Sequence, residues 1–257
     1  MPELPDLQVF SRNLTKKLAG KTLKKVNVTK GARVSVSKAV LKKSIEGQKL
    51  VRVYREGKEL RFLFRNKDVL GIHLMLRGKL FWFEEKNTHA HTLVEFYFDK
   101  TGLALTDFQR KASVTLNPAQ ADAPDALSKE VNSDFWKEAL QSKATIKNLL
   151  LDQHVIRGIG NAYADEILWK AGISPFSKSN KIPPASVRSL ARAVPGVLKK
   201  AEQQISKADP SIIGGELRDF LVIHNSHKKK SPSGAVIKQK VAGARKTYYT
   251  DEQTLFE

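Results

Sequence analysis

The first residues of the chain could carry out covalent chemistry. Pro2 follows the initiator Met1, and removal of Met1 would expose the secondary amine of Pro2. A terminal amine has a pKa of roughly 7.7–8, and its uncharged form can attack an electrophilic carbon and form an iminium. Glu3 lies beside it and could move protons. The alternative, favoured on composition alone, is that Pro2 and Pro5 only shape the start of the chain; a retained Met1 would make the Pro2 nitrogen an unreactive amide.

A segment with two glycines, GIGNAYADEIL at residues 158–168, could bind phosphate. Gly158 and Gly160 allow a tight turn, and Asn161 then begins a helix whose first backbone N–H groups favour anions. A second amphipathic helix is expected just before it, at 143–151. Two helices joined in this way are similar to the helix–turn–helix pairs that grip DNA phosphates. An ordinary pair of connected helices is the alternative.

Two cations are expected in turns between strands. Lys58 lies in EGKEL, residues 56–60, and Arg245 lies in GARKTYY, residues 243–249, at the tip of a hairpin. An arginine there suits a phosphate or a pocket for a flipped base. Solvated cations in turns are common, so the alternative for both Lys58 and Arg245 is a turn residue that only contacts water.

The elements that must position these residues follow from the hydrophobic periodicity. Residues 5–18 have the period of a helix, with Pro5 in the first turn and Gly20 after the end. Alternating patterns then predict many short strands, which is typical of a β-sandwich or barrel; they include 69–76, 79–83, 92–98 and 113–116. Residues 117–126 are typical of a linker. The rest is predicted as helices at 133–141, 143–151, 161–171, 184–206 (with a break at Pro195) and 215–222, followed by a basic hairpin formed by AVIKQKV and RKTYYT.

Composition narrows the classes of function. The 257 residues include 45 Lys and Arg against 26 Asp and Glu, a net charge of +19, which favours a polyanion and above all nucleic acid as partner. The chain has no cysteine, so disulfides and thiolate zinc sites are excluded. No apolar run is long enough to span a membrane, and no signal peptide pattern begins the chain. We therefore expect a cytoplasmic protein close to the DNA, with no metal and no cofactor.

The combined motifs resemble the formamidopyrimidine-DNA glycosylase and endonuclease VIII family over nearly the whole chain. The resemblance depends on the order and spacing of Lys58 and four segments: PELPD at 2–6, KATIKNLLLD at 143–152, GIGNAYADEIL at 158–168 and ARKTYY at 244–249. It implies an α+β fold made of an N-terminal β-sandwich with one helix and a helix-two-turn-helix domain that ends in a hairpin finger. The expected divisions are 1–117, a linker at 118–132, 133–222 and the finger at 223–257.

The resemblance also implies residue roles. Pro2 would attack C1′ of the damaged nucleotide, Glu3 would donate and shuttle protons, and Lys58 would assist β-elimination. Arg245 would grip phosphate and serve δ-elimination. The implied DNA contacts are His89, Arg110, Lys143, Asn161 and Leu76, with Leu76 as a wedge between bases. The implied partner of a monomeric protein is double-stranded DNA with oxidised bases or abasic sites.

Three departures from the family pattern bear on specificity. The missing cysteines place the chain in a branch with a zincless finger, held by packing within the hairpin; the expected residues are Val236, Ile237, Val241, Tyr248 and Tyr249. Lys111 stands where relatives have a stacking Phe, and Gln109 where they have an Arg. The segment 220–231 is short, which favours formamidopyrimidines, oxidised pyrimidines, hydantoins and abasic sites over 8-oxoguanine as substrates.

Two other functions stay open at this point. A DNA- or RNA-binding protein without enzymatic activity on the same scaffold would have the same charge, although it would not need a terminal amine. A ribosome-associated protein is the weaker alternative.

Overall fold

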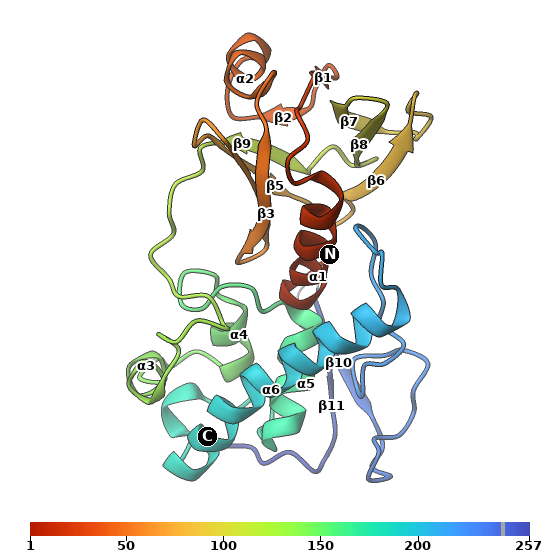
Figure 1. Cartoon of the computed structure of the whole chain (residues 1–257). Coiled ribbons are helices and arrows are strands. Elements are labelled where there is room, and N and C mark those ends of the chain that lie inside the picture. Colours follow the sequence, from red (N-terminus) through yellow and green to blue (C-terminus); the bar gives the residue numbers. More distant parts are fainter. Residues whose placement is uncertain (243–244) are drawn as a thin grey trace. The chain divides into compact units, whose positions relative to one another are not determined.

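The computed structural model describes residues 1–242 and 245–257, which form two compact units (Figure 1). The first unit holds residues 1–120 and 205–216, and the second holds 121–204 and 217–257. Helices and sheets occur together, which confirms the α+β fold. The four-part division predicted from the sequence stays a prediction. Among the described residues, no helix has the length and apolarity needed to cross a membrane.

The first unit consists of two sheets and two helices. One sheet has the strand order β1-β7-β8-β6 and the other β2-β9-β5-β4-β3, and only the pair β2–β9 is parallel. The elements are α1 (Leu4–Leu18), β1 (Lys25–Val28), β2 (Arg33–Val34), α2 (Lys38–Ile45), β3 (Leu50–Glu56), β4 (Glu59–Phe64), β5 (Val69–His73), β6 (Lys79–Glu84), β7 (Thr92–Phe98), β8 (Thr101–Thr106) and β9 (Ser113–Leu116).

Helix α1 is part of the core of this unit and packs against β3 (Figure 1). Leu7, Leu14 and Leu18 recur at helical spacing and are fully buried. Pro5 lies in the first turn, where the missing N–H costs nothing, and Gly20 follows the end of the helix with a φ of 81°. The helix predicted at 5–18 is therefore confirmed, and it fixes the direction in which the first residues of the chain emerge.

The second unit is helical and ends in a hairpin. Its elements are α3 (Ser133–Ala139), α4 (Ile146–Leu151), α5 (Asn161–Ala171), a short 3-10 helix η1 (Ser179–Lys181), α6 (Pro184–Ala208), whose last four residues belong to the first unit, β10 (Lys238–Ala242) and β11 (Arg245–Tyr249). The predicted helix at 161–171 has the bounds of α5. Its C-cap, Gly172, has the left-handed φ of 72° that glycine adopts without strain.

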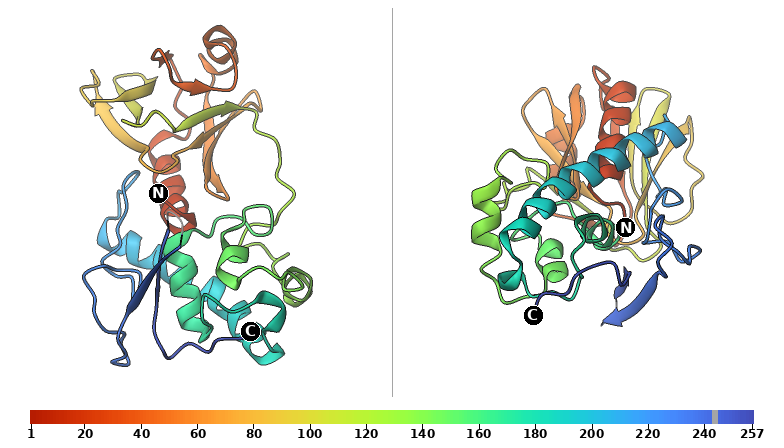
Figure 2. Two further views of the ribbon diagram at one scale, coloured as in Figure 1. Left: turned by 180° about the vertical axis from the view of Figure 1, so that it is seen from behind. Right: turned by 90° about the horizontal axis from the view of Figure 1, so that it is seen from below.

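Two expectations for this unit are wrong. The break at Pro195 does not occur, because α6 continues through it (Figure 2). A proline removes one helical hydrogen bond, but the buried face of α6, which includes Leu190, Val194 and Leu198, outweighs that loss. The predicted helix at 215–222 is absent.

The end of that segment instead forms a turn and bends, and its backbone is bound by a buried carboxylate. Glu166 of α5 accepts hydrogen bonds from the backbone N–H groups of Val222, Ile223 and His224 at 2.8–2.9 Å. These three N–H groups are therefore bonded to Glu166 of α5 and not within a helix. The apolar pattern that predicts a helix reflects the burial of Leu221 and Ile223.

Candidate functional site

The start of the chain is packed into the first unit. Pro2 and Glu3 are both buried, and Glu3 is the N-cap residue of α1. The backbone N–H of Glu3 donates to Asp6 Oδ2 at 2.8 Å, and the terminal ammonium of Met1 pairs with Glu216 of the same unit. The residue that would carry a terminal amine after loss of Met1 is thus held at the beginning of a buried helix and is not part of a loose tail.

The turn that carries Lys58 is tied to the same helix. Gly57 and Lys58 form the two-residue connection between β3 and β4, where Glu56 pairs with Glu59. A positive φ of 56° at Gly57 alone fits a II′-type hairpin turn, which has glycine at its first central position. The Arg55 guanidinium donates to the Gly57 carbonyl and, through Nε, to Gln8 Oε1 of α1, both at 3.0 Å.

A buried arginine stabilises the base of this turn. Arg61 pairs with Glu56 at 2.6 Å and with Glu59 at 2.9 Å, and its Nη2 donates to the Ala119 carbonyl at 3.0 Å. Charge-assisted bonds of this kind are the stronger class of hydrogen bond. Arg61 therefore holds the carboxylates of Glu56 and Glu59, the two that are nearest to Lys58 in the sequence. Sequence reasoning had not singled out Arg61.

His73 is a second residue that sequence reasoning missed here. It lies opposite Glu59 in the β4–β5 register, and its Nδ1 accepts the backbone N–H of Met75 at 3.0 Å. Burial lowers the pKa of His73, and the charge of Lys58 lowers this pKa further. A neutral imidazole therefore faces the Lys58 turn at physiological pH. In the sequence, a lone histidine in an apolar strand gave no signal that it would lie close to Lys58.

Three predicted DNA contacts lie elsewhere in the first unit. Leu76 is exposed in the loop between β5 and β6, and Arg110 is exposed in the loop between β8 and β9, with its Nη1 bonded to the Lys30 carbonyl at 3.0 Å. His89 is half-buried and stacks on Phe81 with ring centroids 4.3 Å apart. One guanidinium N–H of Arg110 is thus bonded within the protein, while the exposed side chain has further N–H donors.

The predicted phosphate-binding residues of the second unit surround α4 and α5. Asn161 is the first residue of α5, and its side-chain amide donates to the Lys246 carbonyl of β11 at 2.9 Å. Helix α4 begins at Ile146, three residues later than predicted, so Lys143 lies in the exposed turn before it. Arg245 is exposed at the first position of β11, opposite Ala242. Gly243 and Ala244 of the GARKTYY motif lie outside the described residues.

The hairpin is held by polar and aromatic contacts with other segments of the second unit, which corrects the expectation of packing within it. Val236 and Val241 are 59% and 60% exposed, and of the five expected residues only Tyr248 is buried. Strand β11 instead lies along α5 (Figure 2), where the Tyr248 backbone N–H donates to Asp165 Oδ2 at 2.9 Å.

Asp165 is the centre of these contacts. It is fully buried and pairs with Lys147 Nζ of α4 at 2.7 Å, and its Oδ2 lies 2.7 Å from His224 Nδ1. Lys147 in turn donates to Thr247 Oγ1 of β11 at 2.8 Å. One carboxylate therefore joins α4, α5, the 220–231 segment and the hairpin. Sequence reasoning missed it because these partners are up to 83 residues apart.

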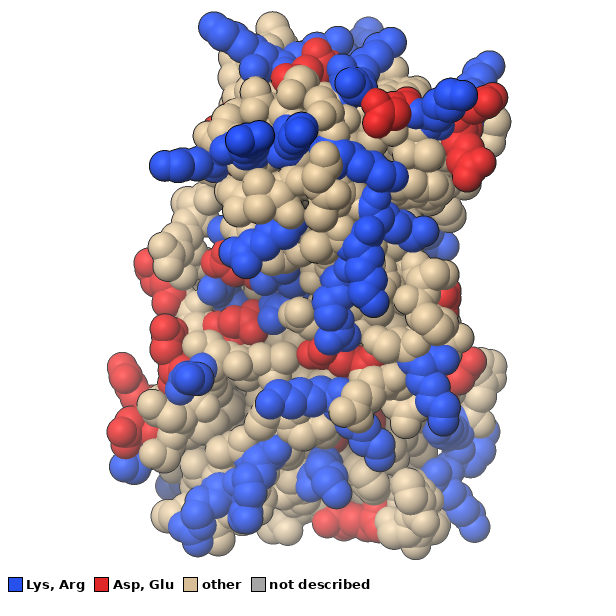
Figure 3. Space-filling view, viewed as in Figure 1, with Lys and Arg blue, Asp and Glu red and all other residues tan. Residues whose placement is uncertain are grey.

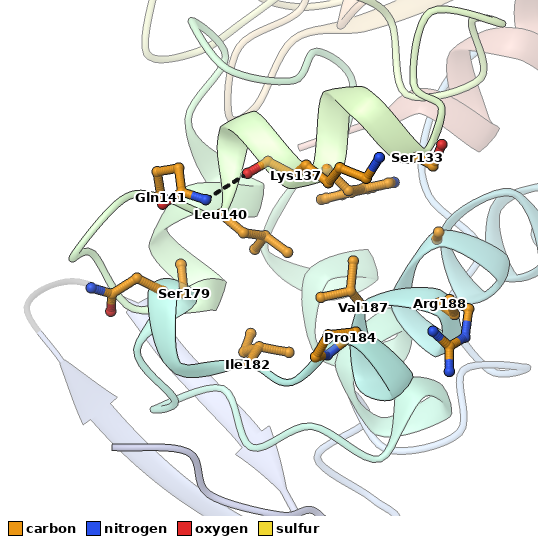
Figure 4. Close-up of a pocket in the computed structure, with 12 residues that line it drawn as sticks. Ser133, Lys137, Leu140, Gln141, Ser179, Ile182, Pro184, Val187 and Arg188 are labelled. Carbon is orange, nitrogen blue, oxygen red and sulfur yellow. Dashed lines mark hydrogen bonds between the residues drawn. The ribbon is translucent and has the colours of Figure 1, made fainter.

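Two cavities in the described part of the second unit have no predicted site residue in their lining. One has a volume of about 410 Å³ and lies between α3, η1 and α6, with Leu140, Ile182 and Val187 on its walls (Figure 4). The other, of about 660 Å³, lies between α5, α6 and residues 220–222. Among the described residues, no three His, Asp or Glu side chains gather to hold a metal ion.

Positive charge extends over both units. Lys and Arg side chains outnumber Asp and Glu on the face seen in Figure 3, over the sheets of the first unit and the helices of the second alike. In each unit by itself, this excess of cations favours contacts with phosphate groups.

Comparison with known proteins decides the family. The model of the formamidopyrimidine-DNA glycosylase N-terminal domain matches residues 1–114, and the model of the H2TH domain of the same enzyme matches residues 123–209. The formamidopyrimidine-DNA glycosylase of Brevibacillus brevis is 30% identical over 96% of this chain and 97% of its own. The chain belongs to the formamidopyrimidine-DNA glycosylase family. The enzyme of that name from Lactobacillus gasseri is 28% identical over the full length of both chains.

Solved structures of the family share this fold. Lactococcus lactis Fpg in complex with DNA containing an abasic site has a TM-score of 0.87 at 23% identity, covering 98% of this chain and 100% of that one. Another structure, of LlFpg with THF-DNA and an inhibitor, has the same TM-score and coverage at 25% identity. The resemblance inferred from PELPD, GIGNAYADEIL and ARKTYY is thereby confirmed at the level of the family. The roles of individual residues stay predictions.

Proposed function

We propose that this chain is a DNA glycosylase and abasic-site lyase of base excision repair that uses Pro2 as its nucleophile. One observation carries the proposal. Pro2 and Glu3 are buried at the start of α1, and the same helix holds the Lys58 turn through Gln8 and Arg55. A candidate nucleophile, a carboxyl group and a lysine turn thus share one rigid support, as precise covalent catalysis requires.

The reaction begins once Met1 has been removed. The uncharged Pro2 nitrogen attacks C1′ of the damaged nucleotide, the base leaves with a proton, and opening of the sugar ring gives an iminium between Pro2 and C1′. Glu3 donates and shuttles these protons.

Strand cleavage follows from the iminium. Loss of a C2′ proton breaks the bond from C3′ to its phosphate, with Lys58 assisting this β-elimination. Arg245 grips phosphate and serves δ-elimination at the C5′ side, and water then releases the sugar fragment and regenerates the amine. The complete scheme is a β,δ-elimination that leaves a gap in the strand.

The DNA substrate is bound by the remaining predicted residues. Lys143 and Asn161 contact phosphates from the second unit, His89 and Arg110 contact the backbone from the first, and Leu76 enters the duplex. The neighbouring structures of Fpg with DNA containing an abasic site and of LlFpg with THF-DNA support damaged DNA as the partner. We infer that this DNA is a duplex and that the enzyme acts as a monomer.

The substrates that we propose are formamidopyrimidines, oxidised pyrimidines and abasic sites, with 8-oxoguanine as a weaker one. The named relatives are formamidopyrimidine-DNA glycosylases. The 220–231 segment is short and its start is bound by Glu166, which leaves little chain to cover a large flipped purine.

A panel of duplexes tests this function. Each duplex carries one defined lesion, and base release and strand cleavage are measured separately for the wild type and for Pro2→Gly. We expect both activities in the wild type and loss of base release in the variant. Binding to all duplexes without release or cleavage on any of them would instead support the non-enzymatic nucleic-acid-binding protein.

A further inference from the structure

The larger cavity of the second unit has the size of a binding site. Its volume of about 660 Å³ lies within the range of roughly 300–1,000 Å³ that is typical of ligand pockets. Its walls come from α5, from α6 up to Gln204, from residues 220–222 and from Pro232, all of which belong to the second unit. None of its described lining residues has a role in the proposed reaction or in the proposed DNA contacts. The cavity is therefore a feature that the proposed function does not use.

The interior of the cavity is mainly apolar. Trp169 of α5, Val197 of α6 and Phe220 line it and are half-buried. The carboxylate among the described lining residues is that of Glu166, which is buried and accepts the backbone N–H groups of residues 222–224 at 2.8–2.9 Å. Both of its oxygens are therefore engaged within the protein. An occupant of the interior gains free energy by burying apolar surface of its own there.

Three cations border the cavity without an ion pair. Lys170 of α5 and both Arg192 and Lys200 of α6 line it, and their side chains are exposed. Within residues 1–242 and 245–257, no carboxylate pairs with any of the three. Cations around an apolar cavity attract an anionic partner and orient it so that its apolar group enters.

Gly196 of α6 leaves part of the cavity wall without a side chain. Glycine in a helix interior is less favourable than alanine, because it loses more backbone freedom on folding. A Cβ at position 196 would meet no atom within 4 Å, and φ there lies outside the left-handed region, so neither packing nor backbone conformation requires glycine. Because Gly196 lines the cavity, an occupant can approach the backbone of α6 closely at this position.

A peptide fits these features better than duplex DNA does. Duplex DNA presents charged phosphates on its outside, so it would pair with the cations and leave the apolar interior unfilled. An acidic peptide supplies carboxylates for the cations and a large apolar side chain for the interior at the same time.

We propose that the cavity between α5, α6 and residues 220–222 is a docking site for an acidic peptide segment of a partner protein. A large apolar side chain of the peptide enters beside Gly196, and its aspartates or glutamates pair with Lys170, Arg192 and Lys200. Docking also stabilises the segment 220–224, because residues 220–222 form one wall and Glu166, which also lines the cavity, binds residues 222–224. The site does not depend on the covalent chemistry at Pro2.

Binding of synthetic peptides to the full-length protein tests the proposal. The probes are short blocked peptides with a fluorescent label, each with one Phe, Trp or Leu flanked by Asp and Glu; matched probes carry Ala in place of the apolar residue, or Asn and Gln in place of the acids. We expect the best acidic probe to bind about ten-fold more tightly than either of its matched probes. In its presence, hydrogen exchange should slow at the amides of Val222 and Ile223 and stay unchanged in β7 of the first unit.

Two substitutions with matched controls locate the bound peptide. Gly196→Leu fills the cavity, and because leucine favours a helix more than glycine does, the variant should fold normally. It should weaken peptide binding about ten-fold, whereas Ala185→Leu, at an exposed position of α6 outside the lining, should not. Lys200→Glu should weaken binding about five-fold at low salt and less at high salt. Its neighbour Lys199, which is exposed but does not line the cavity, serves as the control in Lys199→Glu.

Three results would overturn the proposal. The first is the failure of every acidic peptide to bind more tightly than its matched probes. The second is binding that survives Gly196→Leu, or that Lys199→Glu weakens as much as Lys200→Glu does. The third is an equal loss of affinity for the peptide and for undamaged duplex DNA in Lys200→Glu, because the cations would then serve DNA phosphates.

Discussion

Replacement of Asp165 by Asn should detach the hairpin that carries Arg245 while leaving the first unit intact. Asp165 makes three contacts at 2.7–2.9 Å, and the loss that matters most is the ion pair with Lys147, because both side chains are almost fully buried. Removal of one partner of a buried pair costs about 3–5 kcal/mol. Asn can still accept the Tyr248 N–H, so we expect a value near the lower end.

The effect is measurable in two ways. For the 125 residues of the second unit, with an unfolding entropy of about 2.1 cal/mol/K per residue, about 3 kcal/mol lowers the Tm by roughly 11 °C. Hydrogen exchange at the Tyr248 amide should speed up at least as much as exchange in α5, because its acceptor is weakened. In Lys147→Met/Asp165→Asn the two losses should be clearly non-additive, since they remove the same contact. Unchanged exchange at Tyr248 together with an unchanged Tm in Asp165→Asn would refute the view that this carboxylate holds the hairpin.

Three further outcomes are expected. Glu3→Gln should leave binding to abasic duplex within about two-fold but abolish base release, because an amide cannot donate the proton; normal release in a single-turnover assay would remove Glu3 from the scheme. The free energy of unfolding should fall as the pH drops below about 6.5, the ordinary pKa of histidine, because burial lowers the pKa of folded His73 and the unfolded chain then binds the proton first. His73→Asn should flatten this slope in urea titrations between pH 7.5 and 5, whereas the exposed control His227→Asn should not. Plots of log affinity against log salt should be linear, with a slope of about −0.9 for each phosphate contact, and Lys143→Ala should reduce the slope by about one contact on damaged and undamaged duplexes alike.

The sequence was most informative where periodicity and end signals coincide. Helices α1 and α5 and strands β7 and β9 were predicted nearly to the residue from their apolar spacing, and Pro5 and Gly20 marked the two ends of α1. Helix α2 was missed because its eight residues bury only Leu41 and Ile45. Strand β8 was missed because residues 102–106 are all buried, so the alternation expected of a half-buried strand is absent.

In the candidate site, too, local motifs were predictable from the sequence and distant contacts were not. Pro2, Glu3 and Lys58 follow from residue types in short motifs, and the structure places them on one helix and the turn bonded to it. Contacts distant in sequence could not be predicted, because they arise from the fold. Asp165 is an ordinary acidic residue of a helix until β11 brings Tyr248 to it, and no local pattern connects Arg61 with the carbonyl of Ala119.

The attachment point of the DNA in the covalent intermediate tests the central claim most directly. The enzyme is incubated with abasic duplex and borohydride, the adduct is digested with protease and nuclease, and the modified peptide is sequenced by mass spectrometry. We predict a peptide that begins at Pro2, lacks Met1 and carries the reduced sugar fragment on the Pro2 nitrogen. An adduct on a lysine side chain, or full base release by protein that retains Met1, would contradict the account.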